Sequence, residues 1–304
     1  MWMEHTLIYF KLLLLNTALL VLFPLLLAQG LWVRRRTLRL PEPDGERLFE
    51  SPTFCEKSGV NVLVLGDSAA AGVGATHQQH ALSGLLYSAL SNVGSARVVL
   101  QAKTGYTSED VLNMLQNASV EKFNVALISV GVNDVTHFTS LRRWQQQCQQ
   151  IQALLAGKFQ CNLIIFSELP PIHLFPAIVQ PLRWVLGQRA KLFNQALQEV
   201  VRLHNTKGEC SSVFLPLDIM YNPKNNDADV VVDAGANTHT NINANTQVNT
   251  ESAKSPRSEI VTRFQDMKDS GFMATDGFHP SSKAYSLWVD RILVVLNKQT
   301  WIKS

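Results

Sequence analysis

The sequence predicts an α/β fold in which a mainly parallel sheet is covered by helices on both faces and is preceded by a hydrophobic N-terminal helix. From Val60 onward, short apolar segments alternate with longer segments of helical spacing. The first of them, Val60–Leu65, stops at a glycine and is typical of a buried parallel strand. Repeated strand–helix units of this kind form sheets with helices on both faces.

Five strands and five helices are expected along the chain. The expected strands are Val60–Leu65, Ala96–Ala102, Val125–Val130, Asn162–Phe166 and Val213–Leu217. The expected helices are Ala81–Leu90, Ser108–Asn117, Leu141–Leu155, Pro181–His204 and Ser281–Leu296, with Thr107 or Ser108 as N-cap of the second. Because the active site of such a sheet lies beyond the carboxyl ends of its strands, the residues that follow each strand are the candidates for catalysis.

The N-terminal segment is almost wholly apolar from Leu12 to Val33. As a helix it would extend over roughly 30 Å, which is long enough to cross a bilayer. We interpret residues 1–33 as a membrane anchor. Two alternatives stay open: a cleaved signal peptide, since Ala28-Gln29-Gly30 resembles a cleavage site, and a buried or interfacial helix.

The charges beside this segment favour a single-pass anchor in the inner (cytoplasmic) membrane. Only Lys11 precedes the apolar core, whereas four arginines follow it: Arg34, Arg35, Arg36 and Arg39. By the positive-inside rule, the catalytic domain would then lie on the cytoplasmic side. Export to the periplasm or secretion is the alternative.

The remaining chain divides into a linker and one domain. Residues 34–58 are expected to be a linker because Pro41, Pro43 and Pro52 discourage regular structure. Residues 59–300 would form the catalytic domain. Within it, residues 222–257 are dominated by Asn, Thr, Ala and Asp and are expected to be a disordered insertion, because they cannot bury enough apolar surface.

Net charge and cysteine spacing argue against nucleic-acid binding and against a zinc site. The net charge is only +3, so nothing indicates a nucleic-acid-binding protein. The four cysteines are widely spaced without a CxxC pair, which argues against a zinc site. We expect all four to be free thiols, given the cytoplasmic placement.

The sharpest local feature is Gly66-Asp67-Ser68, directly after the first strand. The strand would deliver Ser68 to the carboxyl edge of the sheet. Small residues follow as far as Gly74 and would let a substrate approach the backbone closely. A serine hydroxyl is a poor nucleophile unless a base takes its proton. The simpler interpretation of this tripeptide alone is a turn.

A candidate base lies just before the last helix, in the segment Asp276–Pro280. His279 could accept the proton of Ser68, and Asp276 could hold the imidazole in the right tautomer and stabilise its cation. The simpler interpretation of this segment alone is a turn at the start of a helix.

Two further candidates follow the second and third strands. Asn133, in Gly131–Asp134, could donate its side-chain amide to an oxyanion, and Gly105 could donate its backbone N–H. Each alone is also compatible with a turn.

Together these four sites resemble the SGNH hydrolase superfamily, also called GDSL esterases and lipases, in which four blocks supply Ser, Gly, Asn and His. The matching blocks are Val62–Ser68, Thr104–Thr107, Gly131–Asp134 and Asp276–Pro280. Two departures are Ala69, which stands where the GDSL name has leucine, and the long polar insertion before the last block. Among subgroups, the chain is most similar to the compact bacterial lysophospholipase- and thioesterase-like members.

The resemblance implies a flavodoxin-like three-layer fold with a five-stranded, mainly parallel sheet. It also implies a catalytic triad of Ser68, Asp276 and His279. The oxyanion hole would consist of the Ser68 and Gly105 N–H groups and the Asn133 side chain.

The expected function is serine-dependent hydrolysis of a carboxylic ester or thioester, without a metal or cofactor. Lysophospholipids, acyl thioesters and acetylated sugars all fit this chemistry, and the apolar N-terminus favours lipid-like acyl substrates. The alternatives are a carbohydrate O-deacetylase and a non-catalytic, membrane-anchored binding protein.

Overall fold

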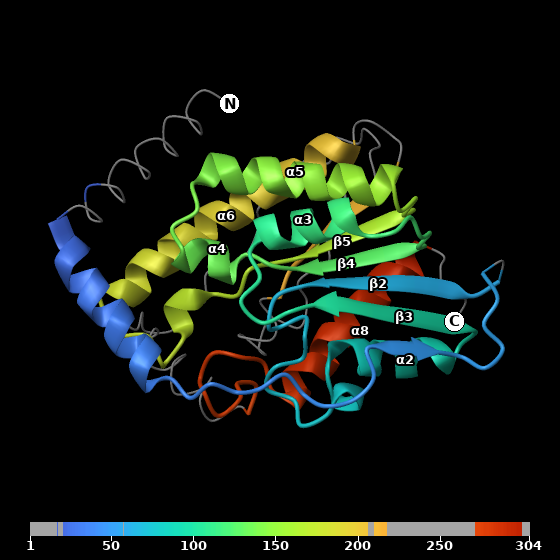
Figure 1. The fold of residues 1–304 in the computed structure, drawn as a ribbon, viewed down its shortest axis with the longest axis horizontal. Coiled ribbons are helices and arrows are strands. Elements are labelled where there is room, and N and C mark those ends of the chain that lie inside the picture. Colours follow the sequence, from blue (N-terminus) through green and yellow to red (C-terminus); the bar gives the residue numbers. More distant parts are fainter. Residues whose placement is uncertain (1–16, 18–20, 57, 206–209, 218–270, 300–304) are drawn as a thin grey trace, which may run out of the picture.

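The protein is built around one six-stranded sheet with the spatial order β1-β3-β2-β4-β5-β6 (Figure 1). The computed structural model describes residues 17, 21–56, 58–205, 210–217 and 271–299. Its strands are β1 (Leu48–Glu50), β2 (Val60–Gly66), β3 (Ala96–Ala102), β4 (Val125–Ser129), β5 (Leu163–Ser167) and β6 (Ser211–Leu215). β2 to β6 are parallel, and their order along the sheet (second, first, third, fourth, fifth) is that of flavodoxin.

Helices cover both faces of this sheet, which confirms the predicted α/β fold. The helices are α2 (Leu82–Ser91), α3 (Ser108–Asn117), α4 (Val132–Thr136), α5 (Leu141–Gly157), α6 (Leu182–Asn205) and α8 (Ser282–Lys298), with short 3₁₀ turns η1 (Gln78–His80) and η2 (Ile172–Leu174). α2 and α8 lie together on one face, and α3, α5 and α6 on the other (Figure 1).

Hydrophobic burial explains why the central strands form. In β2, the residues Val62–Leu65 are fully buried, as are Val125–Ile128 of β4. Strands covered on both faces need continuous apolar runs of this kind. Helix α3 begins at the residue that the sequence predicts. Thr107 caps it through a capping box with Asp110, which satisfies backbone N–H groups of the first turn.

The segment expected to be a linker differs from expectation, because it contributes the sixth strand. β1 pairs antiparallel with β3, with Phe49 opposite Val98. It is only three residues long, and prolines precede and follow it at Pro43 and Pro52. A strand this short at the edge of a sheet depends on its partner rather than on a local pattern, so sequence periodicity did not reveal it.

The N-terminal helix, residues 21–36 of the described chain, lies beside the α/β domain (blue in Figure 1). No helix within the described ranges is both long and apolar enough to span a bilayer. Of the expected anchor segment Leu12–Val33, residues 12–16 and 18–20 lie outside the described residues. The polar insertion at 222–257 also lies outside them.

Candidate active site

Ser68 lies just beyond the carboxyl end of β2. The strand ends at Gly66, where φ is +148° and an added Cβ would lie 1.8 Å from the carbonyl oxygen of Ser129 on β4. Only glycine therefore lets the chain pass this point. The Asp67 N–H donates to the same Ser129 oxygen (3.0 Å), and the Val73 N–H donates to the Ser68 carbonyl (3.0 Å), which closes the turn that presents Ser68.

Most of the small residues after Ser68 serve packing, and one of them lies where substrate could approach the backbone. Ala70 and Ala71 are buried, and a Cβ on Gly74 would lie 2.2 Å from the carbonyl oxygen of Pro280. Of this run, Ala69 lines the cavity in front of the site. The small side chains thus let the turn after β2 contact the turn before α8.

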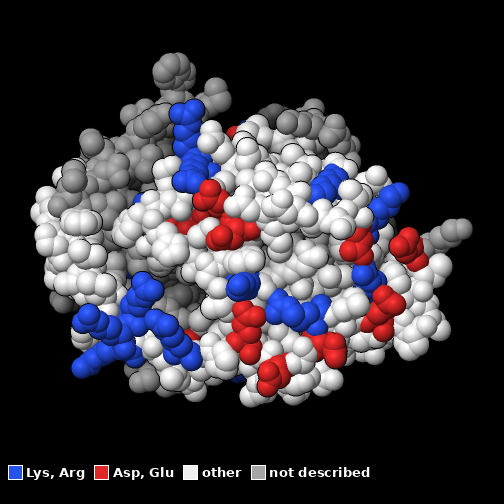
Figure 2. Space-filling view, in the orientation of Figure 1, with Lys and Arg blue, Asp and Glu red and all other residues white. Residues whose placement is uncertain are grey.

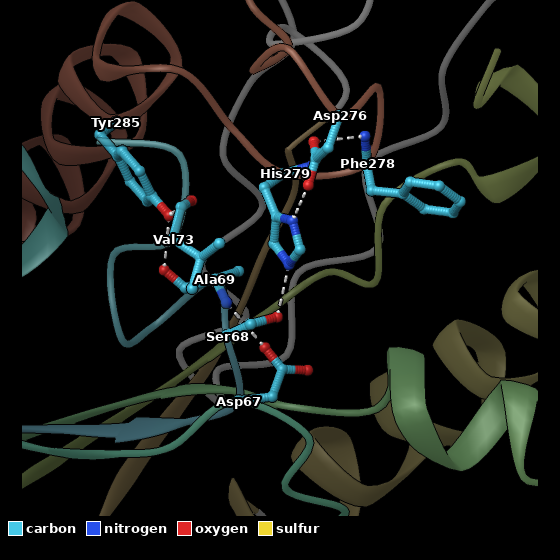
Figure 3. Close-up of polar contacts among 8 residues, drawn as sticks. All are labelled: Asp67, Ser68, Ala69, Val73, Asp276, Phe278, His279 and Tyr285. Atoms are coloured by element: carbon cyan, nitrogen blue, oxygen red, sulfur yellow. Dashed lines mark hydrogen bonds and ion pairs between the residues drawn. The ribbon is translucent and has the colours of Figure 1, made fainter. Parts of the chain in front are cut away.

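Tyr285 on α8 contacts the backbone of the turn that follows Ser68. Its hydroxyl lies 2.9 Å from the carbonyl oxygens of both Ala69 and Val73 (Figure 3). The side chain is fully buried. Sequence reasoning missed this residue, because an aromatic side chain on an amphipathic helix is indistinguishable from an ordinary core residue.

His279 and Asp276 reach Ser68 from the tight turn before α8. His279 Nε2 lies 2.8 Å from Ser68 Oγ, and His279 Nδ1 lies 2.5 Å from Asp276 Oδ2 (Figure 3). The turn is closed by the Ala274 N–H, which donates to the His279 carbonyl (2.8 Å), and by the Gly277 N–H, which donates to the Ala274 carbonyl (3.0 Å). The structure thus brings the three predicted residues into one hydrogen-bonded chain.

The Asp276 carboxylate is buried and hydrogen-bonded on both oxygens. Its Oδ1 accepts from the backbone N–H groups of Phe278 (3.0 Å) and His279 (3.1 Å), while Oδ2 faces the imidazole. Burial acts to raise the pKa of Asp276, but the hydrogen bonds from His279 and Phe278 outweigh it, so the pKa lies below its usual value. The carboxylate is therefore ionised at neutral pH and suited to orient and stabilise a histidine cation.

Gly105 and Asn133 come from the ends of β3 and β4. Gly105 has a φ of +89°, and nothing lies within 4 Å of a Cβ added there, so the space beside its backbone is open. The Asn133 side-chain amide donates from Nδ2 to the Tyr106 carbonyl (2.9 Å). This bond fixes the plane of the amide beside the loop that carries Gly105.

Two buried carboxyl groups support these loops. Asp134 accepts from the backbone N–H (2.9 Å) and hydroxyl (2.6 Å) of Ser108, which ties α4 to the start of α3. Asp67 accepts from the Ala69 N–H at 3.1 Å. Burial raises the pKa of Asp67 to about 7, although the Ala69 bond opposes this shift.

The site opens into one large cavity of about 1350 Å³. Ser68, Gly105, Asn133 and His279 all line it. Its walls are mostly apolar and come chiefly from three parts of the chain: the segment from the end of β4 through α4, the segment from η2 to α6, and the N-terminal helix. The contribution of the N-terminal helix was not expected from the sequence.

A family model for GDSL-like lipases and acylhydrolases matches residues 64–233, which is more than half of the chain. The chain belongs to the GDSL-like lipase/acylhydrolase family. This confirms the resemblance inferred from the four sequence blocks and the prediction of a serine ester hydrolase. The match includes Ser68, Gly105 and Asn133 of this acylhydrolase and stops before Asp276 and His279. The relation of these two residues to Ser68 rests on the hydrogen bonds that His279 makes with Asp276 and Ser68.

Several solved structures resemble this GDSL-like acylhydrolase at low sequence identity. TesA is 17% identical, with 78% of this chain and 97% of TesA covered at a TM-score of 0.47. A lipase/acylhydrolase from Enterococcus faecalis is 17% identical (80% and 97% covered, TM-score 0.48). A catalytic mutant of the acetylxylan esterase Axe2 from Geobacillus stearothermophilus is 15% identical (81% and 97% covered, TM-score 0.47). No curated protein matches the chain.

Proposed function

We propose that the protein hydrolyses carboxylic ester or thioester bonds through an acyl-enzyme intermediate, with Ser68 as nucleophile, His279 as base and Asp276 as the partner of the histidine. One observation carries this proposal. The hydrogen-bond chain from Asp276 through His279 to Ser68 Oγ is continuous and ends in a cavity large enough for an acyl substrate.

The chemistry follows from the order of these three side chains, with the imidazole of His279 between the Asp276 carboxylate and the Ser68 hydroxyl. His279 Nε2 takes the proton of Ser68 Oγ as the oxygen attacks the carbonyl carbon, and Asp276 stabilises the imidazolium through Nδ1–H. The same proton then passes to the leaving alcohol or thiol. Water, activated by His279 in turn, attacks the acyl-enzyme and releases the acid.

The oxyanion hole would combine the backbone N–H groups of Ser68 and Gly105 with the side chain of Asn133. An asparagine amide has two N–H donors, and one of them already donates to Tyr106. The other is available to a substrate oxygen. Gly105 lines the same cavity as Ser68 and Asn133, which would bring its backbone N–H near that oxygen.

The size and polarity of the cavity favour a lipid-like acyl group over acetyl. At about 1350 Å³, its volume exceeds the usual range of roughly 300–1,000 Å³ for small-molecule pockets. Among the lining residues are Phe175, Leu182, Leu186 and Phe278, and the Phe175 and Phe278 rings meet edge to face at 5.9 Å. An acetyl group would leave most of this apolar surface uncovered, whereas a longer chain would bury it.

A fluorophosphonate probe and a panel of p-nitrophenyl esters from acetate to palmitate test this function. We expect the wild type to be labelled and to prefer longer acyl chains, and Ser68→Ala to lose both labelling and turnover. Ser88→Ala, an exposed serine on α2, is the matched control. A strict preference for acetate would indicate an O-deacetylase instead, and a folded wild type that resists the probe would indicate a binding protein.

The membrane placement inferred from the sequence stays a prediction. The single-pass anchor depends partly on residues outside the described ranges, and the cytoplasmic placement depends on Arg34, Arg35, Arg36 and Arg39. A reporter fused to the C-terminus and active on only one side of the membrane would test the sidedness.

A further inference from the structure

The N-terminal helix is seated on the catalytic domain by specific contacts. Gln29 Nε2 donates to the Gln180 carbonyl (2.7 Å), and Gln29 Oε1 accepts from the Leu182 N–H (3.1 Å) at the start of α6. Leu26, one turn earlier, is only 4% exposed. These contacts join the helix to the segment between η2 and α6, which forms another part of the cavity wall.

One face of this helix lines the cavity of Ser68. Phe23, Leu26, Leu27 and Gly30 all line it, and their spacing of three and four residues places them on one face. The helix therefore contributes to the proposed acyl site and does not merely tether it.

The opposite face of the helix is also apolar. Val21, Leu25, Ala28 and Trp32 follow the same helical spacing, about 180° around the axis from the cavity face, and none of them lines the cavity. Their exposure is high: Val21 is 74%, Leu25 47% and Trp32 44% exposed. We call these four residues the outer stripe. A helix that is apolar on both faces is normally covered on both.

Basic side chains continue the outer stripe at its C-terminal end. Arg35 and Arg36 are exposed on the same side of the helix, and the Arg36 guanidinium lies 4.8 Å from the centre of the Trp32 ring. Figure 2 shows Lys and Arg side chains gathered at the lower left, where this helix ends in Figure 1. Within the described part of the chain, Arg34, Arg35, Arg36 and Arg39 take part in no ion pair.

We propose that the outer stripe, together with Arg35 and Arg36, is a docking surface for an anionic lipid bilayer. Exposed apolar side chains beside uncompensated arginines complement the acyl and anionic headgroup layers of such a bilayer. The cavity face and the outer stripe belong to one helix about 10 Å thick, so docking places the proposed acyl site next to the lipid. The acyl group in the cavity is taken from the proposed function. The docking of the outer stripe to the bilayer does not depend on that function.

Co-sedimentation of the full chain with vesicles tests the docking. We expect binding to vesicles of phosphatidylglycerol and phosphatidylcholine at 0.1 M NaCl, at least tenfold weaker binding to pure phosphatidylcholine, and release at 0.5 M NaCl. The variants R35Q/R36Q and L25S/W32S should each weaken binding about tenfold or more. Equal binding to both vesicle types would overturn the proposal.

Matched variants separate docking from general changes of the surface. R142Q/K122Q removes two exposed basic residues elsewhere, and V93S/V120S removes two exposed apolar ones, so both should bind as the wild type does. Circular dichroism melting verifies that each variant is folded. If L25S/W32S instead converts a dimer to a monomer in sedimentation velocity without changing vesicle binding, a second copy covers the stripe and the proposal fails.

The Ser68→Ala variant keeps this inference distinguishable from the proposed function. It should bind vesicles as the wild type does, because Ser68 lies on the cavity side of the helix. Vesicle binding without ester hydrolysis by the wild type would leave the docking surface in place and overturn the proposed function. Hydrolysis without vesicle binding would support the proposed function and overturn the docking surface.

Discussion

His279 Nε2 lies 2.8 Å from Ser68 Oγ, although 211 positions separate the two residues in the sequence. Their distance depends on the contact between two turns, the one after β2 and the one before α8. Gly74 allows this contact, because any side chain there would collide with the Pro280 carbonyl. Tyr285 reinforces it from α8, since its hydroxyl reaches the backbone of the serine turn.

Tyr285→Phe tests whether this support positions the nucleophile. The change leaves the buried carbonyls of Ala69 and Val73 without the hydroxyl, which should lower the free energy of unfolding by about 1–3 kcal/mol. If Tyr285 is a positioning residue, kcat for a p-nitrophenyl ester falls while KM changes little. Tyr87→Phe is the control, because no hydrogen bond of the Tyr87 hydroxyl is found in the described chain. A stability loss with unchanged kcat would restrict Tyr285 to a structural role.

Asp276→Asn should abolish most activity without unfolding the protein. An amide at this position cannot stabilise the imidazolium and favours the wrong tautomer of His279, which in a serine triad costs on the order of 10⁴-fold in kcat. The measurement is kcat with p-nitrophenyl butyrate, alongside the circular dichroism spectrum. Asp290→Asn, an exposed carboxylate on α8, should keep full activity. A loss of less than tenfold would argue against Asp276 as the partner of the histidine.

Local sequence patterns predicted the parts of the protein that depend on local physics. A run of apolar residues predicted the buried strand Val60–Leu65, and the capping residue Thr107 predicted the start of α3. Contacts between distant segments left no such pattern. Gln29 meets the chain 151 positions away at Gln180, so no periodicity could reveal that the N-terminal helix forms a wall of the cavity.

Asn133→Ala should remove one proposed donor of the oxyanion hole. Loss of a single side-chain donor costs about 10²- to 10³-fold in kcat, with little effect on KM, because the bond strengthens only in the transition state. The effect is measured with a soluble p-nitrophenyl ester. Asn113→Ala, on the exposed side of α3, is the matched control. A rise in KM with unchanged kcat would show that Asn133 contributes to ground-state binding only.

Asp67→Asn should change how stability depends on pH. The folded-state pKa of Asp67 is raised to about 7 by burial, so the folded protein holds this proton while the unfolded chain releases it near pH 4. Stability contributed by the protonated group is therefore lost as pH rises from about 4 through 7. Asparagine keeps the acceptor for the Ala69 N–H without a charge. As the pH rises from 5 to 8, the melting temperature should fall less in the variant than in the wild type. Parallel melting-temperature curves for the two proteins would contradict a raised pKa of Asp67.

Leu27→Ser tests whether the N-terminal helix belongs to the acyl site. Leu27 lines the cavity, and replacing its isobutyl group by a hydroxymethyl group removes about 1–2 kcal/mol of contact with a long chain. The ratio of kcat/KM for palmitate over acetate esters should therefore fall roughly tenfold. Leu38→Ser is the control, because Leu38 is exposed and does not line the cavity. An unchanged ratio in Leu27→Ser would mean that long acyl chains extend along the α6 wall instead, away from this helix.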